Sequence, residues 1–171
     1  AMLAKRYHTD VHAACAAPVP GEPEAQLTTP ARNLFTALVE QAGLGHLRLI
    51  RESRLGDSRP DFAALHERAG KTHQIGYIEL KAPEVATDPS TWSGRNASQW
   101  QKMSVDAEIL LLCNGRSARL YRDGEAVGDA AELPFDDPHA WDAQPLLRLL
   151  RRFIDSRPTP VTSVGDLSRR L

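Results

Sequence analysis

The sequence has few cysteines and no long hydrophobic segment. Cys15 and Cys113 are its only cysteines and lack CxxC spacing, so we expect free thiols in a reducing cytoplasm rather than disulfides. No run approaches the roughly 18 to 20 apolar residues that span a bilayer, and no basic start followed by an apolar run indicates a signal peptide. These absences predict a cytoplasmic protein with no membrane partner.

The chain also has almost no net charge. It contains 21 Lys and Arg against 22 Asp and Glu, for a formal net charge of −1. A domain that binds nucleic acid by itself is usually more basic, so if DNA is the partner, another domain is expected to supply most of the affinity. The 171 residues are 42% hydrophobic and 25% charged, which suits one domain with a real core and excludes wholesale disorder.

Prolines divide the chain into regions. Three of them fall within residues 16–24, a stretch predicted to be a loop, and residues 1–27 are predicted to form a loosely attached arm or linker. A helix follows, with Thr29 as its cap, Pro30 in its first turn and Gly43 at its end. The main domain is predicted over residues 28–157. Residues 158–171 are predicted to be a linker and the start of a truncated following domain.

The apolar pattern predicts a small α/β core. Strands are expected over 46–55, 61–65 and 74–82, the last two as a hairpin, and then over 107–115 and 116–127, with a turn at Asp123–Gly124. Helices are expected over 97–106, capped by Asn96 or Ser98, and over 137–156. The resulting order is α-β-β-β-α-β-β-α, which predicts an α/β fold with a mixed sheet flanked by helices.

Three charged residues lie in segments that otherwise look like core strands. Asp61 follows Pro60 at the start of one strand, and Glu79 and Lys81 lie in the next. Two carboxylates on adjacent strands can form a hard oxygen site for a divalent cation such as Mg²⁺, with the Leu80 carbonyl as a third ligand. Lys81 projects from the same face of the strand as Glu79, where it can hold an attacking water or neutralise a scissile phosphate.

This pattern resembles the motif of the PD-(D/E)xK nuclease superfamily, which has the restriction-endonuclease-like fold. Pro60 and Asp61 match the PD element, and Glu79, Leu80 and Lys81 match ExK. The neighbouring elements match the superfamily core, an α-β-β-β-α-β arrangement. The resemblance implies a DNA endonuclease that depends on Mg²⁺, with Mn²⁺ as a substitute, and that leaves a 3′-hydroxyl and a 5′-phosphate.

Residues 30–125 are similar to the amino-terminal nuclease domain of single-chain restriction–modification enzymes, which fuse it to further domains, commonly an N6-adenine DNA methyltransferase. In that group an acid on the first helix often joins the metal site, and Glu40 matches it. A glutamine on the helix after ExK matches Gln99, but the usual tyrosine four residues later is replaced by Met103. The resemblance implies a bacterial phage-defence enzyme whose partners are DNA, a methyltransferase and a target-recognition region.

Glu52 competes with Glu40 for the additional place in the metal site. Glu40 lies at the edge of the apolar stripe of its helix, where a carboxylate can lean towards the sheet. Glu52 lies on a strand whose apolar residues, Leu47 and Leu49, are at odd positions, so it is expected to face the other side. This spacing favours Glu40.

Arg95, Trp100 and Lys102 are candidates for DNA contact, because arginines bind phosphates and aromatic rings can stack on bases. Other interpretations remain open. Trp100 can be a core residue, and Glu79 and Lys81 can form an exposed pair on a solvated face of the sheet. The alternative function is a nuclease-fold module that no longer cuts and binds DNA or neighbouring domains. The presence of all the motif residues disfavours it.

Overall fold

A single sheet with helices on both faces forms the body of the protein. The computed structural model describes residues 1–16, 23–51 and 54–156. The helices are α1 (Met2–Ala16), α2 (Pro23–Gln41), the short 3₁₀ helix η1 (Pro89–Thr91), α3 (Gly94–Asp106) and α4 (Gln144–Asp155). The strands are β1 (His46–Arg51), β2 (Phe62–Arg68), β3 (Lys71–Leu80), β4 (Ile109–Cys113), β5 (Ser117–Arg122), β6 (Glu125–Ala126) and β7 (Ala131–Glu132).

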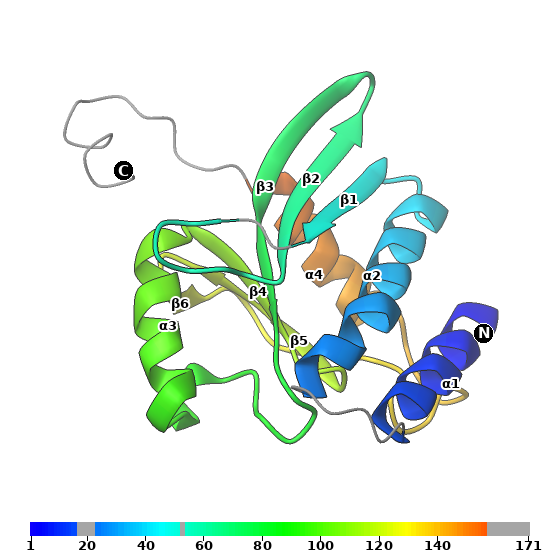
Figure 1. Ribbon diagram of the computed structural model, residues 1–171. Coiled ribbons are helices and arrows are strands. Elements are labelled where there is room, and N and C mark those ends of the chain that lie inside the picture. The colour runs from blue at the N-terminus through cyan, green and yellow to red at the C-terminus, as the bar shows by residue number, and fades with distance from the viewer. Residues whose placement is uncertain (17–22, 52–53, 157–171) are drawn as a thin grey trace.

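Within the described residues the strands form one mixed sheet in the order β1-β2-β3-β4-β5-β6, and β7 pairs with β5. β3 and β4 are parallel, and α3 makes the crossover between them, whereas the other pairs in this part of the chain are antiparallel. A parallel pair needs such a crossover because its strands start at the same end of the sheet. Figure 1 shows β3 in the middle of this arrangement. The predicted fold class, a mixed α/β sheet flanked by helices, is confirmed.

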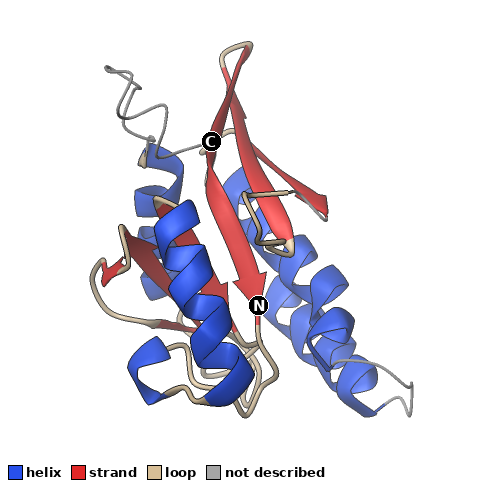
Figure 2. Cartoon of the chain, turned by 60° about the vertical axis from the view of Figure 1, so that its left-hand side comes forward, coloured by secondary structure: helices blue, strands red, loops and turns tan. Residues whose placement is uncertain are grey.

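The two faces of the sheet are covered differently. On one face α1, α2 and α4 pack with the strands to form the larger hydrophobic core. On the other face α3 packs over a smaller cluster that includes Met103 and Tyr121. Figure 2 shows α3 on one side of the strands and α1 and α2 on the other. We call these the core face and the α3 face.

β3 supplies side chains to both faces, because successive side chains of a strand point to opposite sides. Ile78 and Leu80 are buried in the larger core. Tyr77 packs against the smaller cluster under α3. Glu79 and Lys81 share the parity of Tyr77, so they belong to the α3 face. The amide of Lys81, one residue beyond the strand, still donates to the carbonyl of β4 residue 113 over 2.8 Å, which fixes the backbone at this point.

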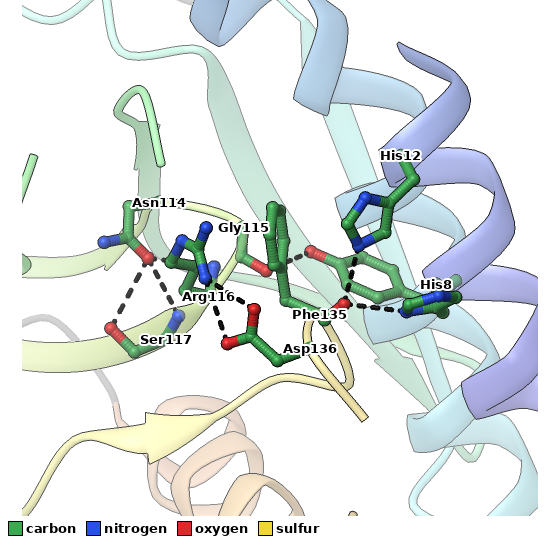
Figure 3. A network of polar contacts seen from close by, with 9 residues as sticks. His8, His12, Asn114, Gly115, Arg116, Ser117, Phe135 and Asp136 are labelled. Atoms are coloured by element: carbon green, nitrogen blue, oxygen red, sulfur yellow. Dashed lines mark hydrogen bonds and ion pairs between the residues drawn. The ribbon is translucent and has the colours of Figure 1, made fainter. Parts of the chain in front are cut away.

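Helix α1 is docked on the fold rather than loosely attached. Tyr7 is buried in the larger core, and its hydroxyl donates to the carbonyl of Gly115 over 2.8 Å. The rings of His8 and His12 both contact the carbonyl oxygen of Phe135, at 2.7 and 2.9 Å (Figure 3). The expectation of a loosely attached arm is therefore wrong for α1. The assignment of separate domain boundaries stays a prediction.

Helix α2 begins earlier than the sequence indicated. The prediction started it at Thr29, whereas it begins at Pro23 and contains Pro30 in its interior. A proline inside a helix forfeits one backbone hydrogen bond. Leu27, four residues before the buried Ala31, is itself fully buried, and this packing on the core face favours a helix that continues through the proline.

Two other helix boundaries differ from the prediction. α3 begins at Gly94 with Ser93 in the capping position and no side-chain capping bond, so the predicted caps at Asn96 and Ser98 are wrong. α4 begins at Gln144, several residues later than expected. The predicted hairpin, the buried fourth strand and the turn at residues 123–124 are confirmed. No helix in the described ranges is long and apolar enough to cross a membrane.

Candidate active site

The candidate site lies where β2 and β3 pair next to the loop from β1. Phe62 pairs with Ile78, so Asp61, which precedes β2, lies beside Glu79. Oδ2 of Asp61 accepts a hydrogen bond from the Leu80 amide over 2.7 Å. The two carboxylates line the same cleft. The convergence that the hairpin predicted is therefore observed, and the catalytic roles of these residues stay predictions.

Glu79, Lys81 and Gln99 form a closed hydrogen-bonded triangle. Lys81 Nζ donates to Glu79 Oε1 over 2.8 Å and to Gln99 Oε1 over 2.7 Å. Gln99 Nε2 donates to the same Glu79 Oε1 over 2.7 Å. The side chains of Lys81 and Glu79 are only 3% and 5% exposed. Because Gln99 comes from α3 and the other two from β3 and its end, the triangle joins the helix to the sheet.

The second carboxylate oxygen of Glu79 has no hydrogen-bond partner among the described residues. Oε2 is buried, and no hydrogen-bond donor among the described residues reaches it. A buried acceptor without a partner costs roughly 1–3 kcal/mol, and more when it is charged. The triangle therefore occupies one oxygen of Glu79 and leaves the other without a hydrogen bond from the described residues.

An open cleft of about 620 Å³ contains these residues. Its walls come from the start of α2, the loop before β2, the end of β3 and the first half of α3. The lining residues are Glu24, Asp57, Ser58, Arg59, Asp61, Glu79, Leu80, Lys81, Arg95, Asn96, Ser98, Gln99 and Lys102. The cleft is thus polar and contains both acids and bases, as a site for a metal and an anionic substrate would.

The two neighbouring carboxylates make each other's ionisation unfavourable. Burial, followed by the negative charge of Asp61, raises the pKa of Glu79 to about 7, although Lys81 opposes the shift. Burial also raises the pKa of Asp61, while the hydrogen bond from the Leu80 amide and the charge of Lys81 lower it. One lysine therefore does not neutralise the pair, and an additional cation would stabilise both carboxylates.

The donor set fits a hard divalent cation of the Mg²⁺ type. Mg²⁺ prefers oxygen ligands, and it commonly binds one or two carboxylates while it keeps several waters. No group of three or more His, Cys, Asp or Glu side chains within the described residues is arranged to hold a metal. Asp61 and the unpartnered Oε2 of Glu79 would supply the one or two carboxylate ligands that Mg²⁺ commonly takes from a protein. The Leu80 carbonyl, on a cleft-lining residue, stays a predicted third ligand.

Glu40 is not at this site. Its carboxylate is 67% exposed and lies 3.7 Å from the ring of His46, and it does not line the cleft. His46 pairs with Glu67 at the far end of β2, whereas Asp61 precedes the near end. The prediction of Glu40 as a metal ligand or catalytic residue is therefore wrong, because the last turn of α2 reaches the opposite end of the sheet.

The spacing argument against Glu52 assumed that the site shares the face of Leu47 and Leu49. Those two residues are buried in the larger core, whereas Glu79 and Lys81 belong to the α3 face. The assumption is therefore wrong. Glu52 itself lies outside the described residues, and its role stays a prediction.

Glu24 is the acid of α2 that the sequence analysis missed. It lies in the first turn of the helix, lines the cleft, and its negative charge contributes to the raised pKa of Asp61. The prolines around it suggested a loop. The apolar spacing of Leu27 and Ala31, extended backwards, was the signal that could have placed Glu24 on the helix.

The basic candidates divide into two groups. Arg95 and Lys102 line the cleft, together with Arg59, which the sequence analysis did not single out. Trp100 does not line it; its ring packs edge-on against Tyr121, with centroids 4.9 Å apart. The structure therefore gives half-buried Trp100 a packing role against the smaller cluster, and its contact with DNA stays a prediction.

The fold has a solved neighbour. The chain is similar to the cryo-electron-microscopy structure of a DrdV–DNA complex, with a TM-score of 0.58 and 21% sequence identity. The match covers 92% of this chain and 14% of that chain, so the whole fold corresponds to a small part of a larger protein. No protein-family model matches the sequence, and no curated protein matches it. At this identity the likeness establishes the fold, a mixed α/β sheet flanked by helices.

Proposed function

We propose that the protein is a metal-dependent nuclease domain that hydrolyses phosphodiester bonds in DNA. The observation that supports it best is the pair of carboxylates, half-buried Asp61 and buried Glu79, beside a lysine fixed in the same open cleft. The PD and ExK resemblance supports the same reaction. The likeness of the fold to a chain from a DrdV–DNA complex is consistent with DNA as the partner.

Asp61, Oε2 of Glu79 and the Leu80 carbonyl would hold Mg²⁺ or Mn²⁺. When bound, such an ion polarises a phosphoryl oxygen and makes a bound water more acidic. The protein's part is to present carboxylates that are already fixed. The Leu80 amide holds Asp61, and Lys81 and Gln99 hold Glu79 through its other oxygen. The ligands therefore need little reorganisation.

Lys81 would act on the phosphate and the attacking water. Its ammonium group can donate a hydrogen bond to a phosphoryl oxygen, or hold the water in line with the phosphorus. Gln99 is a positioning residue in this scheme, because its two polar atoms contact Lys81 and Glu79 at once. The products would be a 3′-hydroxyl and a 5′-phosphate, as the resemblance implies.

Arg59, Arg95 and Lys102 are the proposed DNA contacts, because they line the cleft around the acids. Contacts of arginine and lysine to phosphates position the strand without reading its sequence. With a formal charge of −1, we expect weak binding by the chain alone, since affinity for DNA scales with the phosphates neutralised. Target choice would then belong to other parts of a larger restriction–modification or phage-defence enzyme, with a methyltransferase among them, acting in the bacterial cytoplasm.

Metal binding tests the proposal most directly. We expect Mn²⁺ to bind the chain in titrations followed by electron paramagnetic resonance, and Asp61→Asn or Glu79→Gln to weaken binding at least about tenfold. Glu40→Gln is the matched control, an exposed acid outside the cleft, and should bind as the parent does.

A nicking assay on supercoiled plasmid then tests the reaction itself. Slow nicking should require Mg²⁺ or Mn²⁺ and should disappear with Asp61→Asn. Nicking that survives in excess chelator would refute the metal-dependent mechanism. Tight Mn²⁺ binding without any nicking, by the chain or by the larger protein, would refute the nuclease and favour a nuclease-fold module that binds without cutting.

A further inference from the structure

The ammonium group of Lys81 has a third neighbour besides Glu79 and Gln99. Nζ lies over the ring of Trp92, 5.6 Å from its centroid. An ammonium has three hydrogen-bond donors, and a cation over an aromatic face within about 6 Å is attracted by the ring quadrupole. Two donors are directed at oxygens, and the Trp92 ring covers the group from another side. This enclosure agrees with the 3% exposure of the Lys81 side chain.

The Trp92 ring is held from two directions. Its Nε1 donates to the carbonyl of Ala86 over 2.7 Å. Trp100 meets it edge-on, with centroids 6.1 Å apart and ring planes at 84°. Trp100 in turn packs against Tyr121 of β5. The ring position is therefore determined by its own loop and by the helix that also contributes Gln99.

The loop that contains Trp92 is fixed by contacts to the strands behind it. The Tyr121 hydroxyl donates to the carbonyl of Thr87, and the Asn114 side-chain amide to that of Val85, each over 2.7 Å. Asp88 caps the short helix η1, which ends directly before Trp92. A loop that the sequence presents as a run of small and polar residues is thus a rigid support.

We infer that Trp92 is a positioning residue for Lys81. Its ring closes one side of the ammonium group and holds Nζ beside Glu79 and Gln99 before any substrate arrives. This inference deepens the proposed function and rests on it, because a fixed lysine matters only if Lys81 acts on a phosphate or a water. The advantage is an ammonium group that already lies beside the two carboxylates when the phosphate enters.

Reagent access to Nζ tests this role without any catalytic assay. The lysines are trace-labelled with isotopic acetic anhydride, in chelator and without DNA, and quantified by peptide mass spectrometry. Exposed Lys5 and Lys71 serve as internal references. We expect Trp92→Leu to raise the labelling rate of Lys81 about tenfold relative to them, because the cation–π cover is lost. Trp92→Phe, with a weaker aromatic face, should give an intermediate rate.

Trp141→Leu is the matched control, since Trp141 is also a half-buried tryptophan whose Nε1 donates to a backbone carbonyl, that of Glu132, but it packs against the larger core and not on the α3 face. Thermal unfolding of each variant reports the general loss of packing. A Lys81 labelling rate that rises equally in Trp141→Leu, or stays at the parental value in Trp92→Leu, would show that Trp92 only packs. If Trp92→Leu does not fold, equal Lys81 rates in Trp92→Phe and the parent overturn the inference.

The labelling result does not depend on nuclease activity. A chain that binds no Mn²⁺ and cuts no DNA would refute the proposed function even if Lys81 is unmasked by Trp92→Leu. Conversely, if the chain cuts DNA but the labelling rate of Lys81 is the same in Trp92→Leu and the parent, the proposed function stands and Trp92 has no role in positioning Lys81. Mn²⁺ affinity should stay within about twofold in Trp92→Leu, because the ring touches the lysine and not the unpartnered oxygen of Glu79.

Discussion

The core face and the α3 face of one sheet are built by opposite physical rules. On the core face, side chains such as Leu34, Phe35 and Phe153 are buried with no polar partner to satisfy. On the α3 face, the apolar cluster is small, and beside it lie a buried lysine, a buried glutamate and an unpartnered carboxylate oxygen. The strand β3 contributes side chains to both faces, because its successive side chains point to opposite sides of the sheet.

This difference separates the residues that stabilise the fold from the residues of the candidate site. Burial of apolar surface on the core face supplies favourable free energy. The two carboxylates of the α3 face oppose folding, since their removal from water raises the pKa of both Asp61 and Glu79. Strain of this kind is typical of functional sites, where the rest of the protein holds groups in costly positions.

The largest expected effect is on the core face. Phe153 is fully buried in α4, so Phe153→Ala should lower the free energy of unfolding by about 3–5 kcal/mol. Urea denaturation followed by circular dichroism measures it. Val105→Ala, at a position on α3 that is 80% exposed, should stay within about 0.5 kcal/mol. Equal losses for the two variants would contradict the separation of the faces.

On the α3 face the main effect should be on chemistry. We expect Lys81→Met to reduce the plasmid nicking rate by about 100-fold or more, the usual contribution of a positioned proton donor or acceptor. Mn²⁺ binding should persist, because Asp61 and Glu79 remain. Circular dichroism checks the fold, and Glu40→Gln is the control for rate. Nicking at the parental rate by a folded Lys81→Met would remove the lysine from the mechanism.

The strain at Glu79 should appear as a pH dependence of stability. Its pKa is raised to about 7 in the folded protein from an ordinary 4.5, so protonation favours folding, and this stabilisation is lost as pH rises from about 4.5 through 7. In chelator, the free energy of unfolding of Glu79→Gln should therefore rise by about 1–3 kcal/mol relative to that of the parent as the pH increases from 5 to 8. A stability difference that does not change over this range would contradict the strained carboxylate.

The smallest expected effect concerns the additional acid. Glu24→Gln should weaken Mn²⁺ binding by about tenfold or less, because an acid beyond the direct ligands acts through water and through its field. Glu52→Gln, measured in the same titration, tests the remaining candidate from the sequence. Glu40→Gln should leave the affinity unchanged. A loss with Glu40→Gln alone would overturn the placement of the acids.

The hairpin and its polar residues were predictable because their signals are local. Alternation around Glu79 and Lys81 determines that the two share a face, and pairing with the preceding strand brings Asp61 beside Glu79. Gln99 was found through the resemblance, and the structure places its amide between the other two. These predictions needed no knowledge of how the helices pack.

The choice between Glu24, Glu40 and Glu52 was not predictable in the same way. Which end of α2 approaches the site depends on the direction in which that helix crosses the sheet, and its amphipathic spacing is the same in either direction. The start of the helix was also hidden, because Pro18, Pro20 and Pro23 favoured a loop, and Pro30 was placed in the first turn. The assumption that the site shares the apolar face of β1 was wrong for a related reason. Alternation along a strand divides its side chains between two faces, but it does not indicate which face contains the site.

The sequence alone thus determined the mixed α/β fold, the hairpin and the meeting of Asp61, Glu79 and Lys81, since period-two alternation and short connections leave few other pairings. The tertiary structure decided which helix acid faces the cleft, which oxygen of Glu79 is left without a partner, and that Trp92 covers the lysine. Those facts depend on packing between segments distant in the chain, where the energy of each contact exists only after the elements have been assembled.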